Sequence, residues 1–229
     1  MMSTHPSSPC AVIFDLDGVL VTTDELHYQS WLALTAKHKI PFDRMINHRL
    51  RGIGRLESLD IILEGTSRTF SEHEKLAMAT EKNADYRRRL AGLGPDDLAP
   101  GAADLLDDLA AHSARMAIAS SSKNAGMIVD RLGIRHRLHA LVDGNDISAS
   151  KPDPEVFLKA AAALNIAPSR CIVIEDAQSG VEAARAAGMR VIGLTAAHGE
   201  GNLAGVDDAC ADLEELTVER IFSLLHTRR

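Results

Sequence analysis

Short apolar runs alternate with longer segments of helical periodicity along most of the chain. The apolar runs predict buried strands at residues 10–14, 115–119, 171–174 and 190–194. Apolar residues at helical spacing predict helices at residues 102–111, 124–132, 154–164, 179–187 and 213–225. Alternating strands and helices are typical of a parallel sheet with helices on both faces. We therefore expect an α/β fold whose core is a Rossmann-like, doubly wound parallel sheet.

A long insertion separates the first two predicted strands. A βαβ unit needs roughly 30 residues, whereas about a hundred lie between Phe14 and Met116. Helical patterns run through this insertion, at residues 24–38, at 56–63 and from Ser71 onward. We predict an inserted all-α helical cap domain at residues 21–95, and a catalytic core domain formed by residues 1–20 and 96–229.

Two carboxylates and a glycine follow the first predicted strand. Asp15 ends the strand, where open α/β sheets bind their ligands, and Asp17 lies just beyond it. Gly18 lets the backbone turn sharply, which frees N–H groups to face an anion. One carboxylate can then act as a nucleophile and the other can move protons. The alternative is that both residues only form a turn.

Three further segments place polar residues at the same expected edge of the sheet. They are the hydroxyl-rich segment Ser120–Asn124, Lys151 before Pro152, and the acidic pair Glu175 and Asp176. Mg²⁺ prefers oxygen ligands and offsets the repulsion between a carboxylate and a phosphate dianion. The candidate metal ligands are Asp15, the Asp17 carbonyl, Glu175 and Asp176.

The remaining strand-end groups suit a transferring phosphoryl group. Backbone N–H groups of Ser120 and Ser121, together with Lys151, are candidates to hold its oxygens. Each segment also has a structural interpretation: the serines as a helix N-cap, the lysine as a solvated charge, and the acidic pair as a turn. All of them in this order predict a phosphoryl-transfer site.

Composition and charge narrow the class of protein. The chain has 229 residues, of which 45% are hydrophobic and 25% charged, as is ordinary for a soluble globular protein. A net charge of −7 argues against nucleic acid, and no long uncharged apolar run predicts a membrane span. Three cysteines and the lack of a signal core favour a reducing compartment. We expect a cytoplasmic monomer that binds a small molecule.

The strand-end residues resemble the four signature motifs of the haloacid-dehalogenase-like phosphotransferases. The resemblance covers nearly the whole chain from Cys10 onward, on the motifs Asp15-Leu16-Asp17-Gly18-Val19, Ser120, Lys151-Pro152 and Glu175-Asp176. It implies that Asp15 becomes phosphorylated and that Asp17 is the general acid and base. It also implies that Ser120 and Lys151 bind the phosphoryl group and that the acidic pair holds Mg²⁺.

The predicted cap is similar to that of the β-phosphoglucomutase family. The similar segments are Asp24–Trp31, Leu50–Leu59, Lys82–Asn83 with Tyr86, and the core loop Ser120–Asn124. The resemblance implies that the phosphate not being transferred is bound by Arg55, Ser122, Lys123 and Asn124. It implies that Asp17 is gated and the sugar pocket lined by Thr23, His27, Ser58 and Lys82. The same substrate-binding set includes Arg51 and Gly52.

Some cap residues depart from the family or have another interpretation. Arg51 stands where the family usually has lysine, and Gly54 and Leu56 replace polar residues. His27 can also be a packing or capping residue. Arg55 lies at a helix start, where the helix dipole disfavours a cation, so an anionic ligand explains it better.

The resemblance predicts a mutase. Phosphorylated Asp15 would donate to β-glucose 1-phosphate, and the resulting β-glucose 1,6-bisphosphate would reorient, return its other phosphate and leave glucose 6-phosphate. One alternative is a Mg²⁺-dependent sugar-phosphate phosphatase of the same superfamily, in which water accepts the phosphoryl group. The other is a catalytically silent module that binds Mg²⁺ or phosphate.

Overall fold

The computed structural model describes residues 9–50, 53–196 and 203–226. The chain divides into two compact units. The larger comprises Met1–Thr22 and Gly94–Arg229, and the smaller comprises Thr23–Leu93. The predicted domain boundaries, after residues 20 and 95, lie close to these divisions. Each unit buries its own hydrophobic cluster.

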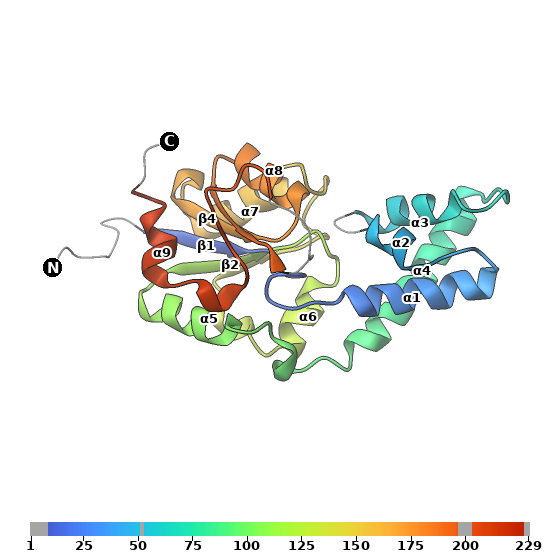
Figure 1. Ribbon diagram of the computed structural model, residues 1–229, viewed down its shortest axis with the longest axis horizontal. Coiled ribbons are helices and arrows are strands. Elements are labelled where there is room, and N and C mark those ends of the chain that lie inside the picture. The colour runs from blue at the N-terminus through green and yellow to red at the C-terminus, as the bar shows by residue number, and fades with distance from the viewer. Residues whose placement is uncertain (1–8, 51–52, 197–202, 227–229) are drawn as a thin grey trace. The chain divides into compact units, whose positions relative to one another are not determined.

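The larger unit is built on a parallel sheet whose strand order is β3-β2-β1-β4-β5-β6 (Figure 1). The strands are β1 (Ala11–Phe14), β2 (Arg115–Ala119), β3 (Ala140–Val142), β4 (Cys171–Glu175), β5 (Arg190–Leu194) and β6 (Asp208–Cys210). β1 is central, and its Phe14 is in register with Ile118 of β2 and Ile174 of β4. The residues that follow these three parallel strands therefore reach one edge of the sheet.

Helices cover both faces of this sheet, so the predicted doubly wound core is confirmed. The helices are α5 (Ala102–Ala111), α6 (Ala125–Arg131), α7 (Glu155–Leu164), α8 (Gln178–Ala186) and α9 (Val218–Ser223). Short 3₁₀ turns are η1 (Pro95–Asp97), η2 (Arg135–Arg137), η3 (Pro168–Arg170) and η5 (Leu213–Glu215). α7 and α8 pack against alternate strand residues such as Ile13 and Val173. The intervening residues, such as Val12, are buried on the opposite face, where α5 and α9 lie (Figure 1).

The structure differs from the sequence prediction near the C-terminus. The single helix predicted over residues 213–225 is wrong, because the chain forms the turn η5 first and α9 begins only at Val218. Thr217 is extended, and its hydroxyl accepts the Arg220 N–H as an N-cap, which starts a new helix there. β3 and β6 have no counterpart among the predicted strands, since each has only 3 residues.

The smaller unit contains four helices among its described residues. They are α1 (Asp24–His38), α2 (Arg44–His48), α3 (Arg55–Leu63) and α4 (Glu72–Leu90). Trp31 of α1, Leu59 of α3 and Met78 of α4 share one buried cluster. Ser71 is the N-cap of α4, and its hydroxyl accepts the Glu74 N–H in the predicted capping box. None of the described helices is both long enough and apolar enough to cross a membrane.

Candidate active site

Asp15 lies at the carboxyl end of β1, beside the end of β4. Its N–H donates to the Ile174 carbonyl at 3.0 Å, which extends the pairing of the two strands by one residue. The residue is 8% exposed. Gly18 has a φ of +92° and turns the chain, so that its N–H donates to the Val21 carbonyl at 2.7 Å. The strand therefore delivers one carboxylate to the edge, and the tight loop after it contains Asp17.

Lys151 reaches the same edge from the loop that precedes α7. Its ammonium donates to Asp15 Oδ1 at 2.5 Å and to Glu175 Oε1 at 2.6 Å. Only 6% of the side chain is exposed. Burial lowers the pKa of Lys151, but the charges of Asp15 and Glu175 outweigh burial, and the net effect raises that pKa. Lys151 is therefore a fixed positive charge beside Asp15.

The carboxylates at this edge outnumber the lysine that faces them. Asp15, Glu175 and Asp176 are all buried. Burial raises the pKa of Asp15 and that of Glu175; Lys151 opposes both shifts, and repulsion from Asp176 adds to them. The edge thus carries an excess of negative charge, which favours a cation among the carboxylates.

Glu175 is held on both carboxylate oxygens. Oε1 accepts the Lys151 ammonium, and Oε2 accepts the N–H groups of Asp176 and Ala177, each at 2.8 Å. The carboxylate rests against the backbone of α8, where a Cβ on Gly180 would lie 1.7 Å from Oε1. Glu175 thus positions Lys151 and fixes the turn after β4.

Asp176 approaches the loop that contains Asp17. A Cβ built on Gly18 would lie 1.9 Å from Asp176 Oδ2, so the carboxylate sits directly over this glycine. Gly18 is needed here both for its positive φ and for the space it leaves. The ends of β1 and β4 are therefore joined by side-chain packing as well as by strand pairing.

The donors at this edge fit a magnesium ion. Among the described residues, no three His, Cys, Asp or Glu side chains already form a metal cage. Mg²⁺ does not need one, because it commonly binds one or two carboxylates and completes its shell with water and substrate phosphate. Asp15 and Asp176 are buried carboxylates in charge excess, next to the main chain of Asp17. That Glu175 is a further ligand stays a prediction, since its oxygens already accept hydrogen bonds.

The loop after β2 presents hydroxyls and backbone N–H groups. Ser120 Oγ accepts the Ser122 N–H at 3.1 Å, and Ser122 Oγ accepts the Asn124 N–H at 3.2 Å. Ser121 Oγ is buried and has no hydrogen-bond partner among the described residues. A buried hydroxyl without a partner is costly, so this one favours a ligand oxygen at the loop. Lys123 follows in the same loop and is exposed.

A second polar cluster is buried within the smaller unit. Lys82 is 2% exposed, and its ammonium lies 2.7 Å from His27 Nδ1 and over the rings of Trp31 and Tyr86. Tyr86 also shares a hydrogen bond of 2.8 Å with the buried Thr23 hydroxyl. Atoms packed around the His27 ring exclude water, and Lys82 is close by, so the pKa of His27 is well below its ordinary value. Neutral His27 therefore accepts from the lysine.

The other predicted cap residues have different surroundings. Arg55 is the first residue of α3, and partial burial lowers its pKa. Ser58 is buried one turn later on the same helix. Arg51 and Gly52 lie outside the described residues. The predicted core residues thus gather at one sheet edge, and Thr23, His27 and Lys82 gather within the helical unit.

Two contributors to these clusters were not among the predicted site residues. Tyr86 lies one helical turn after Lys82 on α4, a spacing that places both on one helix face. Gly180 stands inside a helix, where a glycine in an otherwise helical pattern indicates close packing. Both signals are visible in the sequence, but what packs there depends on the tertiary structure.

Known proteins match most of this chain in sequence. Residues 11–188 match the family described as haloacid dehalogenase-like hydrolases. A β-phosphoglucomutase of Bacillus subtilis is 42% identical over 94% of this chain and 93% of its own length. A phosphorylated carbohydrates phosphatase of Thermotoga maritima is 29% identical over 83% of this chain and 88% of its own length.

The fold has a similar counterpart among solved structures. A crystal structure of β-phosphoglucomutase from Clostridium difficile has a TM-score of 0.86 and 36% sequence identity, covering 96% of this chain and 98% of the other. The resemblance inferred from the motifs is therefore confirmed for nearly the whole chain. Sheet, motifs and relatives agree, and the protein is an enzyme that belongs to the haloacid dehalogenase-like hydrolase family.

Proposed function

We propose that this enzyme is a β-phosphoglucomutase, which interconverts β-glucose 1-phosphate and glucose 6-phosphate. Asp15 is the nucleophile that carries the phosphoryl group, and Asp17 is the general acid and base. Support comes from the carboxylate at the end of β1, paired with the Lys151 ammonium, whose side chain is largely shielded from solvent. This pair provides both an attacking oxygen and a fixed charge for the phosphoryl oxygens.

In the first half-reaction, the sugar attacks phosphorylated Asp15. The sugar O6 forms a bond to phosphorus, the bond between phosphorus and the Asp15 oxygen breaks, and Asp17 takes the O6 proton. The product is β-glucose 1,6-bisphosphate. Lys151 stays charged throughout, because Asp15 and Glu175 hold its pKa high, and it stabilises the charge on the transferring group.

The second half-reaction uses the same residues in reverse order. After the bisphosphate has turned over, an Asp15 oxygen attacks the phosphorus on O1, the bond between that phosphorus and O1 breaks, and Asp17 returns its proton to O1. Glucose 6-phosphate leaves, and Asp15 is again phosphorylated. Bound Mg²⁺, held by Asp15, Asp176 and the Asp17 carbonyl, would neutralise charge on the phosphoryl oxygens.

The remaining groups bind the sugar and its second phosphate in this proposal. Arg55, Ser122, Lys123 and Asn124 hold the phosphate that is not being transferred. The sugar pocket is lined by Thr23, His27, Ser58 and Lys82, which also gate the catalytic action of Asp17. The pairing of the buried Lys82 with His27 supports these roles, since a lysine ammonium surrounded by aromatic rings is pre-organised for an anionic or hydroxyl-rich ligand.

One observation carries the choice of a mutase. The Bacillus subtilis β-phosphoglucomutase is 42% identical across nearly the full length of both chains, whereas the Thermotoga maritima phosphatase is 29% identical. A sugar-phosphate phosphatase is nevertheless the second candidate, since that relative matches 83% of this chain. It would use the same core residues, with water in place of the sugar hydroxyl.

The products of one incubation separate these functions. The purified protein is given β-glucose 1-phosphate, Mg²⁺ and a trace of β-glucose 1,6-bisphosphate, and glucose 6-phosphate and free phosphate are measured, with a chelator arm alongside. We expect glucose 6-phosphate in large excess over free phosphate, and neither product in the chelator arm. Free phosphate as the main product would support the phosphatase. No product at all, with Mg²⁺ present, would overturn both.

A further inference from the structure

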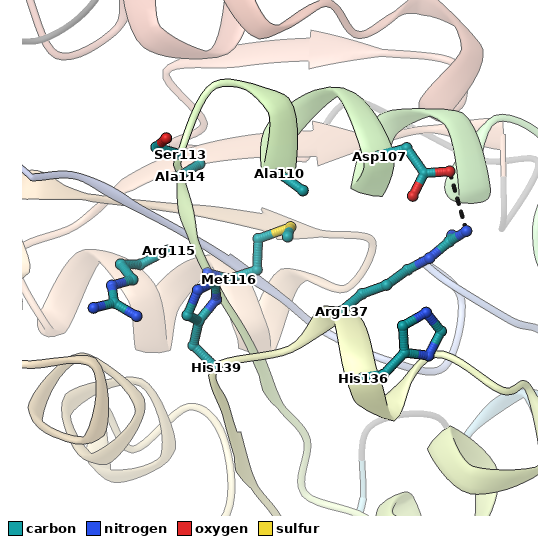
Figure 2. A pocket seen from close by; sticks show the side chains of 9 residues that line it. All are labelled: Asp107, Ala110, Ser113, Ala114, Arg115, Met116, His136, Arg137 and His139. Carbon is teal, nitrogen blue, oxygen red and sulfur yellow. Dashed lines mark hydrogen bonds and ion pairs between the residues drawn. The ribbon is translucent and has the colours of Figure 1, made fainter.

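A pocket lies at the opposite end of the sheet from Asp15. It opens where β2 begins, whereas the Ser120 loop follows the end of β2. Its volume of about 670 Å³ falls within the range of small-molecule sites. Figure 2 shows the nine lining side chains, which are Asp107, Ala110, Ser113, Ala114, Arg115, Met116, His136, Arg137 and His139.

Hydrogen-bond donors and positive charge dominate this lining. The lining contains two arginines, two histidines and a serine but one carboxylate, that of Asp107. Asp107 already accepts from Arg137 at 3.1 Å, as the dashed line in Figure 2 marks. With both arginines and Asp107 charged, the pocket carries a net positive charge on a chain whose net charge is −7. Such a lining favours an anion over a cation.

Two of the donors are fixed in place by the backbone. The Met116 N–H donates to His139 Nδ1 at 3.2 Å, so Nδ1 carries no proton and Nε2–H remains as a donor. Arg137 is held at both ends of its guanidinium, because it donates to the Ala103 carbonyl at 3.2 Å and to Asp107. Donors held in this way lose little conformational freedom when a ligand binds.

Arg115 supplies a positive charge that no described carboxylate of the pocket neutralises, unlike that of Arg137. It is the exposed first residue of β2, and no described carboxylate forms an ion pair with it. Its side chain comes from the same end of β2 as Met116, next to His139 in the pocket lining (Figure 2). A guanidinium without a partner can bind two oxygens of one phosphate group.

We propose that this pocket binds a small organic phosphate, whose phosphate group is held by Arg115 and His139. The volume is larger than a lone phosphate needs, which leaves room for the rest of a sugar-sized metabolite beside Met116 and Ala110. The site is separate from the phosphoryl-transfer edge, because the two lie at opposite ends of β2.

Proton NMR of the histidine side chains tests this site directly. The signals of His136 and His139 are assigned with the variants His136→Gln and His139→Gln, and the full-length protein is titrated with glucose 6-phosphate, with inorganic phosphate and with sodium chloride. We expect glucose 6-phosphate to shift the His139 signal to a plateau. Arg115→Ala should weaken that binding roughly tenfold or more, the loss of one charge-assisted interaction.

The matched control is Arg87→Ala, which removes an exposed arginine of α4 outside the pocket lining. It should leave the His139 titration unchanged. The proposal is overturned if the His139 signal does not saturate, if sodium chloride reproduces the shift, or if Arg115→Ala titrates like the wild type. A plateau with inorganic phosphate but none with glucose 6-phosphate would overturn the organic ligand and indicate an adventitious ion only.

Discussion

Asp15 and Lys151, which are 136 positions apart in the chain, meet at 2.5 Å at the end of β1. The pair lies in an excess of carboxylates, since Glu175 and Asp176 are buried beside it. The lysine thus binds two acidic side chains at once, and a third has to be neutralised by other means. The carboxylates at this edge of the sheet therefore repel one another. A bound metal ion would offset this excess of negative charge and the charge of a substrate phosphate.

Asp15→Asn should abolish turnover and preserve the fold. The amide keeps the shape and one acceptor oxygen for Lys151 but loses the attacking charge. Burial disfavours the ionised carboxylate, and together with repulsion from Glu175 and Asp176 it outweighs the attraction of Lys151 and raises the pKa of Asp15. Removal of this charge should therefore not lower the melting temperature at neutral pH. The matched control is Asp96→Asn, an exposed aspartate of η1. Measurable turnover in purified Asp15→Asn would remove Asp15 from the nucleophile role.

Gly180→Ala should destabilise the protein, although alanine is the better helix former. In an ordinary helix this change gains about 0.5–1 kcal/mol. Here the new methyl would lie 1.7 Å from Glu175 Oε1, so the carboxylate has to move, at a cost of about 1–3 kcal/mol. Displacement of Glu175 also releases Lys151, so activity should fall together with the melting temperature.

Gly126 of α6 provides the matched helical control. The nearest atom to a Cβ there would be Nη2 of Arg135, at 3.4 Å, followed by Leu141 Cδ2 at 3.9 Å and Asp143 Oδ2 at 4.0 Å, so no neighbour has to move. Gly126→Ala should therefore be neutral or slightly stabilising in thermal melts. Equal melting temperatures for Gly180→Ala and Gly126→Ala would contradict the packing of Glu175 against α8.

Acidification should weaken the smaller unit through His27. Exclusion of water and the charges of Lys82 and Arg55 hold the folded-state pKa of His27 well below 6.5. The unfolded chain then binds a proton at His27 more tightly than the folded protein does. The contribution of neutral His27 to the free energy of unfolding is therefore complete above about pH 6.5, and it is lost as the pH falls through the folded-state pKa of His27. Melting temperatures between pH 8 and pH 5 should fall more for the wild type than for His27→Gln, which does not titrate. Parallel curves would mean that His27 is not buried neutral.

Glu155 holds the loop that carries Lys151. One of its oxygens, Oε2, accepts the Ser148 N–H at 2.7 Å, the Ser148 hydroxyl at 2.8 Å and the Ala149 N–H at 2.9 Å. The Lys159 ammonium pairs with the other oxygen, Oε1, at 2.7 Å. These contacts lower the pKa of Glu155 to about 2, so it stays charged at any working pH. Ala149, which Glu155 holds through its N–H, lies only two residues before Lys151.

Glu155→Ala should therefore lower kcat by about 10- to 100-fold, because small displacements of a phosphate-binding group are costly. Glu155→Gln keeps an acceptor oxygen and should restore most of the activity. Glu182→Ala, at an exposed glutamate of α8, is the control for loss of a surface charge. If Glu155→Ala retains full activity, the Ser148–Lys151 loop does not depend on this anchor.

The sequence predicted the parts of the fold that depend on local pattern. Short apolar runs such as Ala11–Phe14 and Cys171–Ile174 favour buried parallel strands, and the carboxylates after them follow at the same edge. β3 and β6 are too short for a periodic signal, since the sheet beside them rather than their own residues stabilises them. Likewise, Glu155 and Gly180 act through contacts that only the folded chain brings together.

Arg55→Ala tests the mutase itself. A bisphosphate that reorients in the active site needs a residue that binds its distal phosphate. A guanidinium can do so with two parallel hydrogen bonds, which lysine cannot form. We expect mutase turnover to fall by a factor on the order of 10² or more, the effect of roughly 3 kcal/mol of lost positioning. Phosphorylation of Asp15 by acetyl phosphate, which has no second phosphate, should change far less, and Arg55→Lys should give an intermediate result. If both reactions fall equally, Arg55 supports the fold or the core site; if neither falls, the distal-phosphate role is wrong and the phosphatase becomes the better assignment.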